Sequence, residues 1–272
     1  MQPKLRKNRL GKTWGFAQAK LDPTSLSALK LKYCLEALET VHGKVLEVGC
    51  GAGMFTIAIK KAKRELQVYG SDIDEKSIKL AKKRTDGVNF RWADIYKLPF
   101  KSGYFDAVVS FDFLEHLDNP SKALLEIARV LKKGGLYHSL TPVENSLATV
   151  HGVLLKFGYF PKRKYADHVQ QYTVSSLRNL MERAGFKFIK VNYSEHYLYQ
   201  LVDTIYFSLL SLLRKNVGNT IEGYIKETQA KNHFVRLFEV TKNVVATLFY
   251  LESSMLKNFP GHGAHITLVK SA

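Results

Sequence analysis

The stretch that decides the fold is VLEVGCGAG, residues 45–53, where an apolar run ends in a Gly-x-Gly-x-Gly turn. A helical pattern follows over residues 54–62. Glycines allow a tight turn and the close approach of a ligand, and the N–H groups of the next helix face the same place. The stretch therefore predicts a buried strand that delivers its end to a nucleotide-like cofactor. Glu47, an acid within the strand end, disfavours a pyrophosphate there and suits a sulfonium or an amino group.

Strand and helix patterns alternate along the following chain. Strands are expected near 44–49, 67–72, 88–92, 105–110, 135–140 and 186–193, and helices near 53–63, 75–84, 120–132 and 173–184. Alternation of this kind predicts an α/β fold with a parallel sheet that is covered by helices on both faces.

The motif Glu-x-Gly-x-Gly-x-Gly at residues 47–53 resembles the first motif of the class I S-adenosylmethionine (SAM)-dependent methyltransferases. Further matching motifs follow in the order of that family: VYGSD (68–72), WAD (92–94), YFDAVVS (104–110), LEHL (114–117), LKKGG (131–135) and MERAGF (181–186). The chain looks most similar to the group that modifies small molecules, quinones, lipids and sugars. The resemblance implies SAM as the cofactor and a Rossmann-like sheet with seven strands, of which the last, near 265–270, is antiparallel.

The resemblance divides the chain into segments. A basic N-terminal arm and helix (1–43) precede the SAM-binding core (44–194), and the final strand of the core sheet lies within 263–272. Members of the family have a short hairpin before that strand, so residues 195–262 are expected to form an inserted helical cap. The cap carries apolar helical stretches at 197–213 and at 234–255. Their apolar faces either pack on each other and on the sheet, or form a pocket or membrane-facing lid for an apolar substrate.

The resemblance places the cofactor at the glycine-rich turn. Gly49, Gly51 and Gly53 would surround its methionine and ribose portions. Glu47 would lie beneath it and organise the loop, with a helix N-terminal cap as the alternative role. Cys50 is expected to be a small neutral filler of this loop.

Asp72 ends the second expected strand, where a carboxylate can accept hydrogen bonds from both ribose hydroxyls. Asp74 competes for this role but is better placed to cap the helix that starts at Glu75. Asp94 would bind the adenine amino group, with a turn-forming role as the alternative. The other residues expected at the cofactor are Ile73, Ala93 and Ile95 beside the adenine, and Ser110 and Phe111 where methyl donor and acceptor meet.

Asp112, Glu115 and His116 follow the fourth expected strand at helical i,i+3 and i,i+4 spacings, which can bring their side chains together. His116 could be a general base for a hydroxyl acceptor. The three residues could instead form a weak divalent-metal site that lowers the acceptor's pKa, and some quinone methyltransferases of this type have similar clusters. In the third alternative, His116 only supports the SAM pocket.

His168 precedes the helix expected at 173–184. Related methyltransferases often carry His-x-x-x-Tyr/Phe-Thr/Ser at this place near the acceptor pocket, so the resemblance implies a substrate role for His168. The basic run Lys162, Arg163 and Lys164 in the same loop could bind an anionic headgroup.

The formal net charge of +17 arises from 41 basic and 24 acidic residues. This excess indicates either solvated helix faces or attraction to an anionic partner such as a membrane surface. Basic residues are hardly interleaved with aromatic ones, which disfavours sequence-specific nucleic-acid binding. The two cysteines cannot form a disulfide framework, so a reducing compartment is expected.

Together these features predict a SAM-dependent methyltransferase that acts on an apolar or amphipathic small molecule, such as a lipid, quinone or glycolipid-like compound, at oxygen. An RNA methyltransferase and a non-catalytic SAM-binding partner subunit are the alternatives. A nicotinamide oxidoreductase is disfavoured because its phosphate loop has Gly-x-Gly-x-x-Gly spacing. The expected location is the cytoplasm, with peripheral association at the inner face of a membrane left open.

Overall fold

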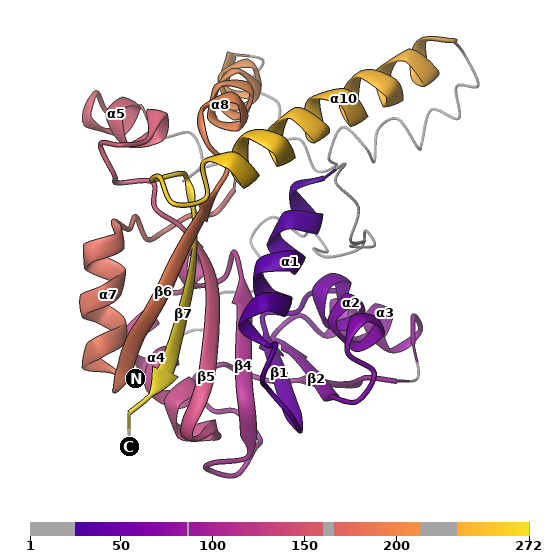
Figure 1. The fold of residues 1–272 in the computed structure, drawn as a ribbon, viewed down its shortest axis with the longest axis vertical. Helices are drawn as coiled ribbons and strands as arrows, with labels where there is room; N and C mark the ends of the chain where they lie inside the picture. Colours follow the sequence, from indigo (N-terminus) through magenta and orange to yellow (C-terminus); the bar gives the residue numbers. More distant parts are fainter. Residues whose placement is uncertain (1–24, 86, 160–165, 213–232, 272) are drawn as a thin grey trace.

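The computed structural model describes residues 25–85, 87–159, 166–212 and 233–271. The predicted basic arm and the loop cluster of Lys162, Arg163 and Lys164 lie outside these residues. Figure 1 shows a central twisted sheet with helices packed along it and a second group of helices beyond one end of its strands.

The sheet has seven strands in the order β3-β2-β1-β4-β5-β7-β6. Their bounds are β1 (Lys44–Val48), β2 (Gln67–Asp72), β3 (Asn89–Trp92), β4 (Phe105–Phe111), β5 (Leu131–Pro142), β6 (Phe186–Ser194) and β7 (Gly263–Lys270). Strands β1 to β5 pair in parallel, and β7 pairs antiparallel with both β5 and β6. The α/β fold with an antiparallel last strand is confirmed.

Strand β5 differs from its prediction at the N-terminal end. It begins at Leu131, within the expected helix, because Leu131 pairs with Phe105 before a register shift in the β4–β5 ladder. The preceding helix, α4 (Pro120–Val130), accordingly stops at Val130.

Alternate residues of the central strands face opposite sides of the sheet, as the pleat requires. Leu46 and Val108 face a core that includes side chains of α4 and α7 (Val174–Arg183). Val45 and Ala107 face a second core with α1 (Leu26–Ala37) and α2 (Met54–Ala62). Helix α3 (Glu75–Lys82) packs beside β2 and β3. The sheet is thus buried on both faces.

The remaining helices lie beyond the carboxyl ends of the parallel strands (Figure 1). Helix α5 (Val150–Lys156) follows β5, and α8 (Tyr197–Leu212) and α10 (His233–Met255) lie in sequence between β6 and β7. Helix α10 also packs against α1. The two helical stretches expected between the last strands are therefore present. The division of the chain into arm, core, cap and final strand stays a prediction. Within the described residues, no helix has the length and apolar character needed to cross a membrane.

Candidate cofactor and acceptor site

The glycine-rich turn after β1 has a backbone that other residues rarely adopt. Gly49, Gly51 and Gly53 have φ angles of 71°, 51° and 84°. A Cβ atom at Gly53 would lie 2.7 Å from the Phe90 ring, and one at Gly49 would overlap the ring of Phe113. Both conformation and space therefore require glycine, because the rings of Phe90 and Phe113 pack directly on the backbone of the turn.

Glu47 is buried beneath this turn, and its Oε2 accepts a hydrogen bond from Thr56 Oγ1 at 2.5 Å. Thr56 lies in the first turn of α2, whose N-cap is Gly53, and both roles considered for Glu47 stay predictions. Burial raises the pKa of Glu47 to about 8, against the lowering effect of the Thr56 hydrogen bond. Cys50 is also buried, and burial raises the pKa of its thiol, so Cys50 is the neutral filler that was predicted.

The free energy of unfolding should decrease as the pH rises from about 4.5 to about 8, since the folded state keeps the Glu47 proton that the unfolded state has released. Glu47→Gln removes this term, which is about 3 to 5 kcal/mol if the whole shift is expressed. The difference in the free energy of unfolding between Glu47→Gln and wild type should therefore increase, in favour of the variant, as the pH rises from about 4.5 to about 8. Denaturant unfolding at several pH values without SAM measures it, with the exposed Glu65→Gln as the control. Parallel pH curves for wild type and Glu47→Gln would contradict the assignment.

Asp72 closes the opposite side of the turn. Its Oδ2 accepts from the Gly51 N–H at 2.8 Å and its Oδ1 from the Asp74 N–H at 2.8 Å, while burial raises its pKa. Asp74 instead caps α3 by accepting from the Ser77 N–H at 3.1 Å, as predicted. The ribose-binding role of Asp72 stays a prediction. Its carboxyl group lies against the glycine-rich turn, which is where a ribose ligand has to be.

The expected adenine-side residues follow β2 and β3. The Ile73 carbonyl accepts from Trp92 Nε1 at 2.8 Å. Asp94 Oδ1 accepts from the Tyr96 N–H at 2.9 Å, which is the turn-forming role left open by the sequence. Ala93 is buried and Ile95 packs on the core beside it.

The side chains that end β4 point into the interior of the fold. Ser110 is fully buried and its hydroxyl lies 2.9 Å from the Tyr137 hydroxyl. Phe111 stacks on Phe55 with ring centroids 4.0 Å apart. Any contact of these two residues with the cofactor would therefore come from their backbone, and Phe113 is the side chain that lies over Gly49.

Beyond β4, a cluster of Glu115, His116 and His168 brings potential ligand atoms within 4.8 Å of one another. Glu115 and His116 belong to the 3-10 turn η1 (Leu114–His116), and the Val169 and Gln170 N–H groups bond to the Glu115 carbonyl, which ties the segment after His168 to this turn. Glu115 is fully buried, and neither carboxyl oxygen has a hydrogen-bond partner among the described residues. Burial raises its pKa well above the usual range.

Asp112 does not reach this cluster through a helix, although its negative charge acts to raise the pKa of both Glu115 and His116. Its backbone is left-handed, with a φ of 47°, and only a short 3-10 turn starts two residues later, so the helical spacing to Glu115 and His116 is not realised. Asp112 Oδ2 instead pairs with Lys30 Nζ at 2.9 Å. His168 takes the third place in the cluster.

Both imidazoles of the cluster face an oxygen through Nδ1. His116 Nδ1 lies 3.1 Å from the Asp167 carbonyl, and His168 Nδ1 lies 2.9 Å from Glu144 Oε1. Since these oxygens accept hydrogen bonds, each Nδ1 is assigned the proton, and each Nε2 keeps a lone pair. Burial, with the neighbouring His168, lowers the pKa of His116 and keeps this ring neutral.

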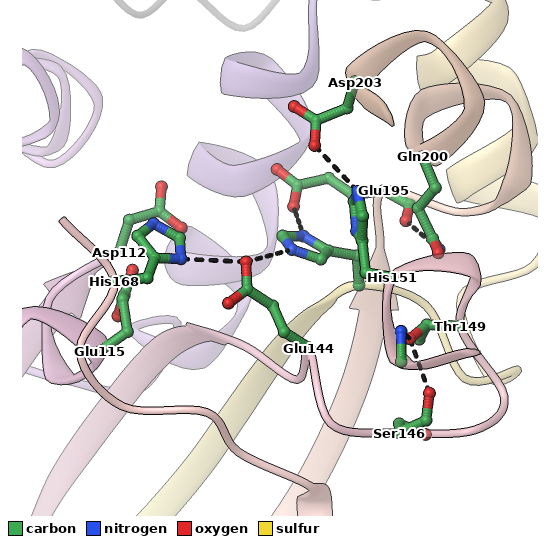
Figure 2. A network of polar contacts seen from close by, with 12 residues as sticks. Asp112, Glu115, Glu144, Ser146, Thr149, His151, His168, Glu195, Gln200 and Asp203 are labelled. Atoms are coloured by element: carbon green, nitrogen blue, oxygen red, sulfur yellow. Dashed lines mark hydrogen bonds and ion pairs between the residues drawn. The ribbon is translucent and has the colours of Figure 1, made fainter. Parts of the chain in front are cut away.

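Sequence reasoning missed the polar residues around this cluster. Figure 2 shows Glu144 with contacts toward His168 on one side and a second imidazole on the other. That ring is His262, and the contacts continue to Glu195 and Lys30. These four residues lie in different segments and form no local motif. The signal that Glu144, Glu195 and His262 share is a polar residue next to a strand end, after β5, after β6 and before β7, whereas Lys30 lies within α1.

Comparisons with known proteins agree with the fold and with the glycine-rich motif. A family described as "Methyltransferase domain" matches residues 46–139. A "Ubiquinone biosynthesis O-methyltransferase" of Coxiella burnetii is 30% identical over 191 residues, which cover 67% of this chain and 80% of that protein. The solved structure of the [4+2]-cyclase SpnF has a TM-score of 0.60 at 18% identity, covering 95% of this chain and 84% of that one. A putative methyltransferase from Bacillus halodurans has a TM-score of 0.59 at 17% identity, covering 89% and 98%.

The fold and the glycine-rich site are those of a cofactor-binding Rossmann-like enzyme, and the structural neighbours share this architecture. The chain belongs to the class I SAM-dependent methyltransferases. It is a methyltransferase, and its cofactor is SAM.

Proposed function

We propose that this enzyme transfers the methyl group of SAM to a hydroxyl oxygen of an apolar or amphipathic small molecule, such as a lipid, a quinone or a glycolipid-like compound. The observation that carries the proposal is the cluster of Glu115, His116 and His168, in which two imidazole rings lie close to a buried carboxyl group. A hydroxyl must lose its proton during methylation, and a neutral imidazole is suited to accept it.

The residues of the turn suit the cofactor. The backbone of Gly49, Gly51 and Gly53 would lie beside SAM. Asp72 would accept hydrogen bonds from the ribose hydroxyls, and Ile73 and Asp94 would contact the adenine. Bound SAM supplies a methyl group on a sulfonium that is already activated for displacement. The chain's own task is to orient both reactants, exclude water and remove the hydroxyl proton.

An apolar acceptor is supported by the helices beyond the strand ends. Large apolar side chains are exposed there on α8 (Leu198, Leu201, Val202 and Ile205) and on α10 (Val244, Leu248, Leu251 and Met255). Exposed apolar patches of this kind mark ligand, protein or membrane contacts. The name of the Coxiella burnetii relative supports oxygen as the methylated atom.

We further propose that the same helix faces rest on an anionic membrane surface, which the net charge of +17 favours. Leu201→Asp combined with Leu251→Asp should then reduce flotation with phosphatidylglycerol vesicles by about tenfold or more, since two exposed apolar contacts are lost. Ile189→Asp, at an equally exposed site on β6, is the control and should float like wild type. Equal flotation of all three proteins would reject the membrane contact.

A divalent metal is a second candidate for activating the hydroxyl. One carboxylate and two imidazoles form a donor set for such an ion. The Glu115 oxygens have no hydrogen-bond partner among the described residues, which fits a ligand role. Treatment with a chelator and readdition of Mg²⁺, Mn²⁺ or Zn²⁺ separates the candidates. Activity that survives chelation supports the imidazole base, and loss with recovery on readdition supports the metal.

The experiment that tests the proposal combines calorimetric titration of SAM with transfer of a tritiated methyl group into a total lipid and small-molecule extract, alongside an RNA sample. Label in the organic phase supports the proposal and provides a product to identify. Label in RNA favours the RNA methyltransferase alternative, and SAM binding without transfer favours a non-catalytic partner subunit.

A further inference from the structure

A continuous chain of buried polar contacts reaches His168 from helix α1. Lys30 Nζ lies 2.8 Å from Glu195 Oε1, and Glu195 Oε2 lies 2.7 Å from His262 Nδ1. His262 Nε2 lies 3.2 Å from Glu144 Oε1, the same oxygen that His168 Nδ1 approaches at 2.9 Å. The chain thus joins residues from α1, the end of β6, the start of β7 and the segment after β5.

The backbone around this chain is strained. Among the described residues, the non-glycine positions with a left-handed φ are Asp112, Asp167 and Glu195. Asp112 and Glu195 both bind Lys30, and the Asp167 carbonyl faces His116 Nδ1. Such conformations cost free energy and cluster at functional sites, which is an observation independent of the polar contacts.

The order of hydrogen-bond donors along these buried contacts indicates which ring nitrogen of His168 carries the hydrogen. The Lys30 ammonium keeps Glu195 ionised, because this contact and that of His262 hold the pKa of Glu195 well below its usual range. Glu195 therefore accepts from His262 Nδ1. The contact between His262 Nε2 and Glu144 Oε1 holds one proton, which belongs either to the imidazole or to the carboxyl group. In both cases Glu144 Oε1 keeps a lone pair that can accept from His168 Nδ1–H.

The two imidazoles of the cluster differ in this respect. His116 Nδ1 faces a neutral backbone carbonyl, whereas His168 Nδ1 faces the Glu144 carboxyl group. A carboxyl oxygen fixes the tautomer and the orientation of an imidazole more firmly than a backbone carbonyl does, as carboxylate–histidine pairs in hydrolases show. The groups that face His168 are Glu115 and His116 from η1 and Glu144 after β5.

We propose that His168, rather than His116, accepts the hydroxyl proton, and that Glu144 and His262 are positioning residues that keep the proton of His168 on Nδ1. This inference rests on the proposed function. The hydroxyl proton moves to His168 Nε2 while the O–CH3 bond forms and the S–CH3 bond breaks, with the bonding pair returning to sulfur. The proton later leaves His168 for solvent.

The tautomer of His168 is measured without any acceptor, by nitrogen NMR of the full chain with 15N-labelled histidine. Wild type should show a protonated Nδ1 and a bare Nε2, with the signals assigned by their loss in His168→Asn. Glu144→Gln should redistribute the proton between the two nitrogens, because an amide can also donate to Nδ1, and Glu144→Asp should restore part of the wild-type pattern. Glu126→Gln, which removes a carboxylate paired with Arg129 elsewhere on the fold, is the matched control. A bare Nδ1 in wild type, or an unchanged spectrum in Glu144→Gln, would overturn the positioning role.

Transfer of labelled methyl into the organic extract tests which imidazole is the base. His168→Asn should lower the transfer rate about 100-fold or more, and His116→Asn less than about tenfold, with unchanged SAM affinity in both. A larger loss in His116→Asn would overturn the assignment. No transfer by wild type would reject the proposed function instead, and the NMR result would still decide the role of Glu144.

Discussion

Asp72→Asn should weaken SAM binding about 100-fold or more while the protein stays folded. The Asp72 carboxylate is buried against the glycine-rich turn, where it accepts from the Gly51 and Asp74 N–H groups. The asparagine side chain has the same shape but loses the charge and one acceptor oxygen. Charge-assisted hydrogen bonds to two ribose hydroxyls are worth about 3 kcal/mol together, which corresponds to this change in Kd. Calorimetric titration with SAM provides the measurement.

The matched control for this variant is Asp74→Asn, two residues away. Asp74 caps α3, and asparagine is also a good N-cap residue, so SAM affinity and stability should both stay close to wild type. If Asp72→Asn bound SAM as tightly as wild type, Asp72 would not be the ribose ligand. If Asp74→Asn lost the affinity instead, Asp74 and not Asp72 would be the ribose ligand.

Glu115→Met should lower methyl transfer, because the Glu115 carboxyl group lies within 4.8 Å of both imidazoles of the cluster, and at the same time stabilise the fold. The Glu115 carboxyl group is fully buried without a hydrogen-bond partner among the described residues, and such a group costs about 1–3 kcal/mol of stability. Methionine has a similar length and carries no polar atom that needs a partner. Thermal unfolding and the labelled-methyl assay measure the two effects.

The opposite signs of these two effects make the result diagnostic. A residue retained for packing would lose stability on replacement, whereas a residue retained for chemistry gains stability and loses activity. Glu182→Met, at an exposed position of α7, is the control and should change neither quantity. A Glu115→Met protein that is less stable than wild type but fully active would show that Glu115 serves the fold.

The cofactor half of the fold was predictable because its signals are local. The apolar run and glycines of residues 45–53 specify β1 and the turn that leads into α2, and Asp72 ends the next strand. The cap role of Asp74 and the neutral environment of Cys50 were predicted for the same reason.

The acceptor half was predictable only in part. His116 and Glu115 follow β4 directly, but the expected grouping with Asp112 assumed a helix where the chain makes a 3-10 turn. Local spacing also does not reveal that Lys30 reaches Asp112 across the fold. Glu144, Glu195 and His262 come together only through the pairing of β7 between β5 and β6, which involves residues far apart in the sequence.

The position of β7 has a consequence for the order in which the molecule can be built during synthesis. In the described sheet, β6 is bonded to its neighbours only through β7, although β7 follows it by about seventy residues. A growing chain on the ribosome can complete β1 to β5 and the glycine-rich turn early. It cannot attach β6 until residues 263–270 have emerged, nor can it place His262 between Glu144 and Glu195. The growing chain can therefore form its glycine-rich turn before the contacts of His262 with Glu144 and Glu195, and only the completed sheet brings the two together.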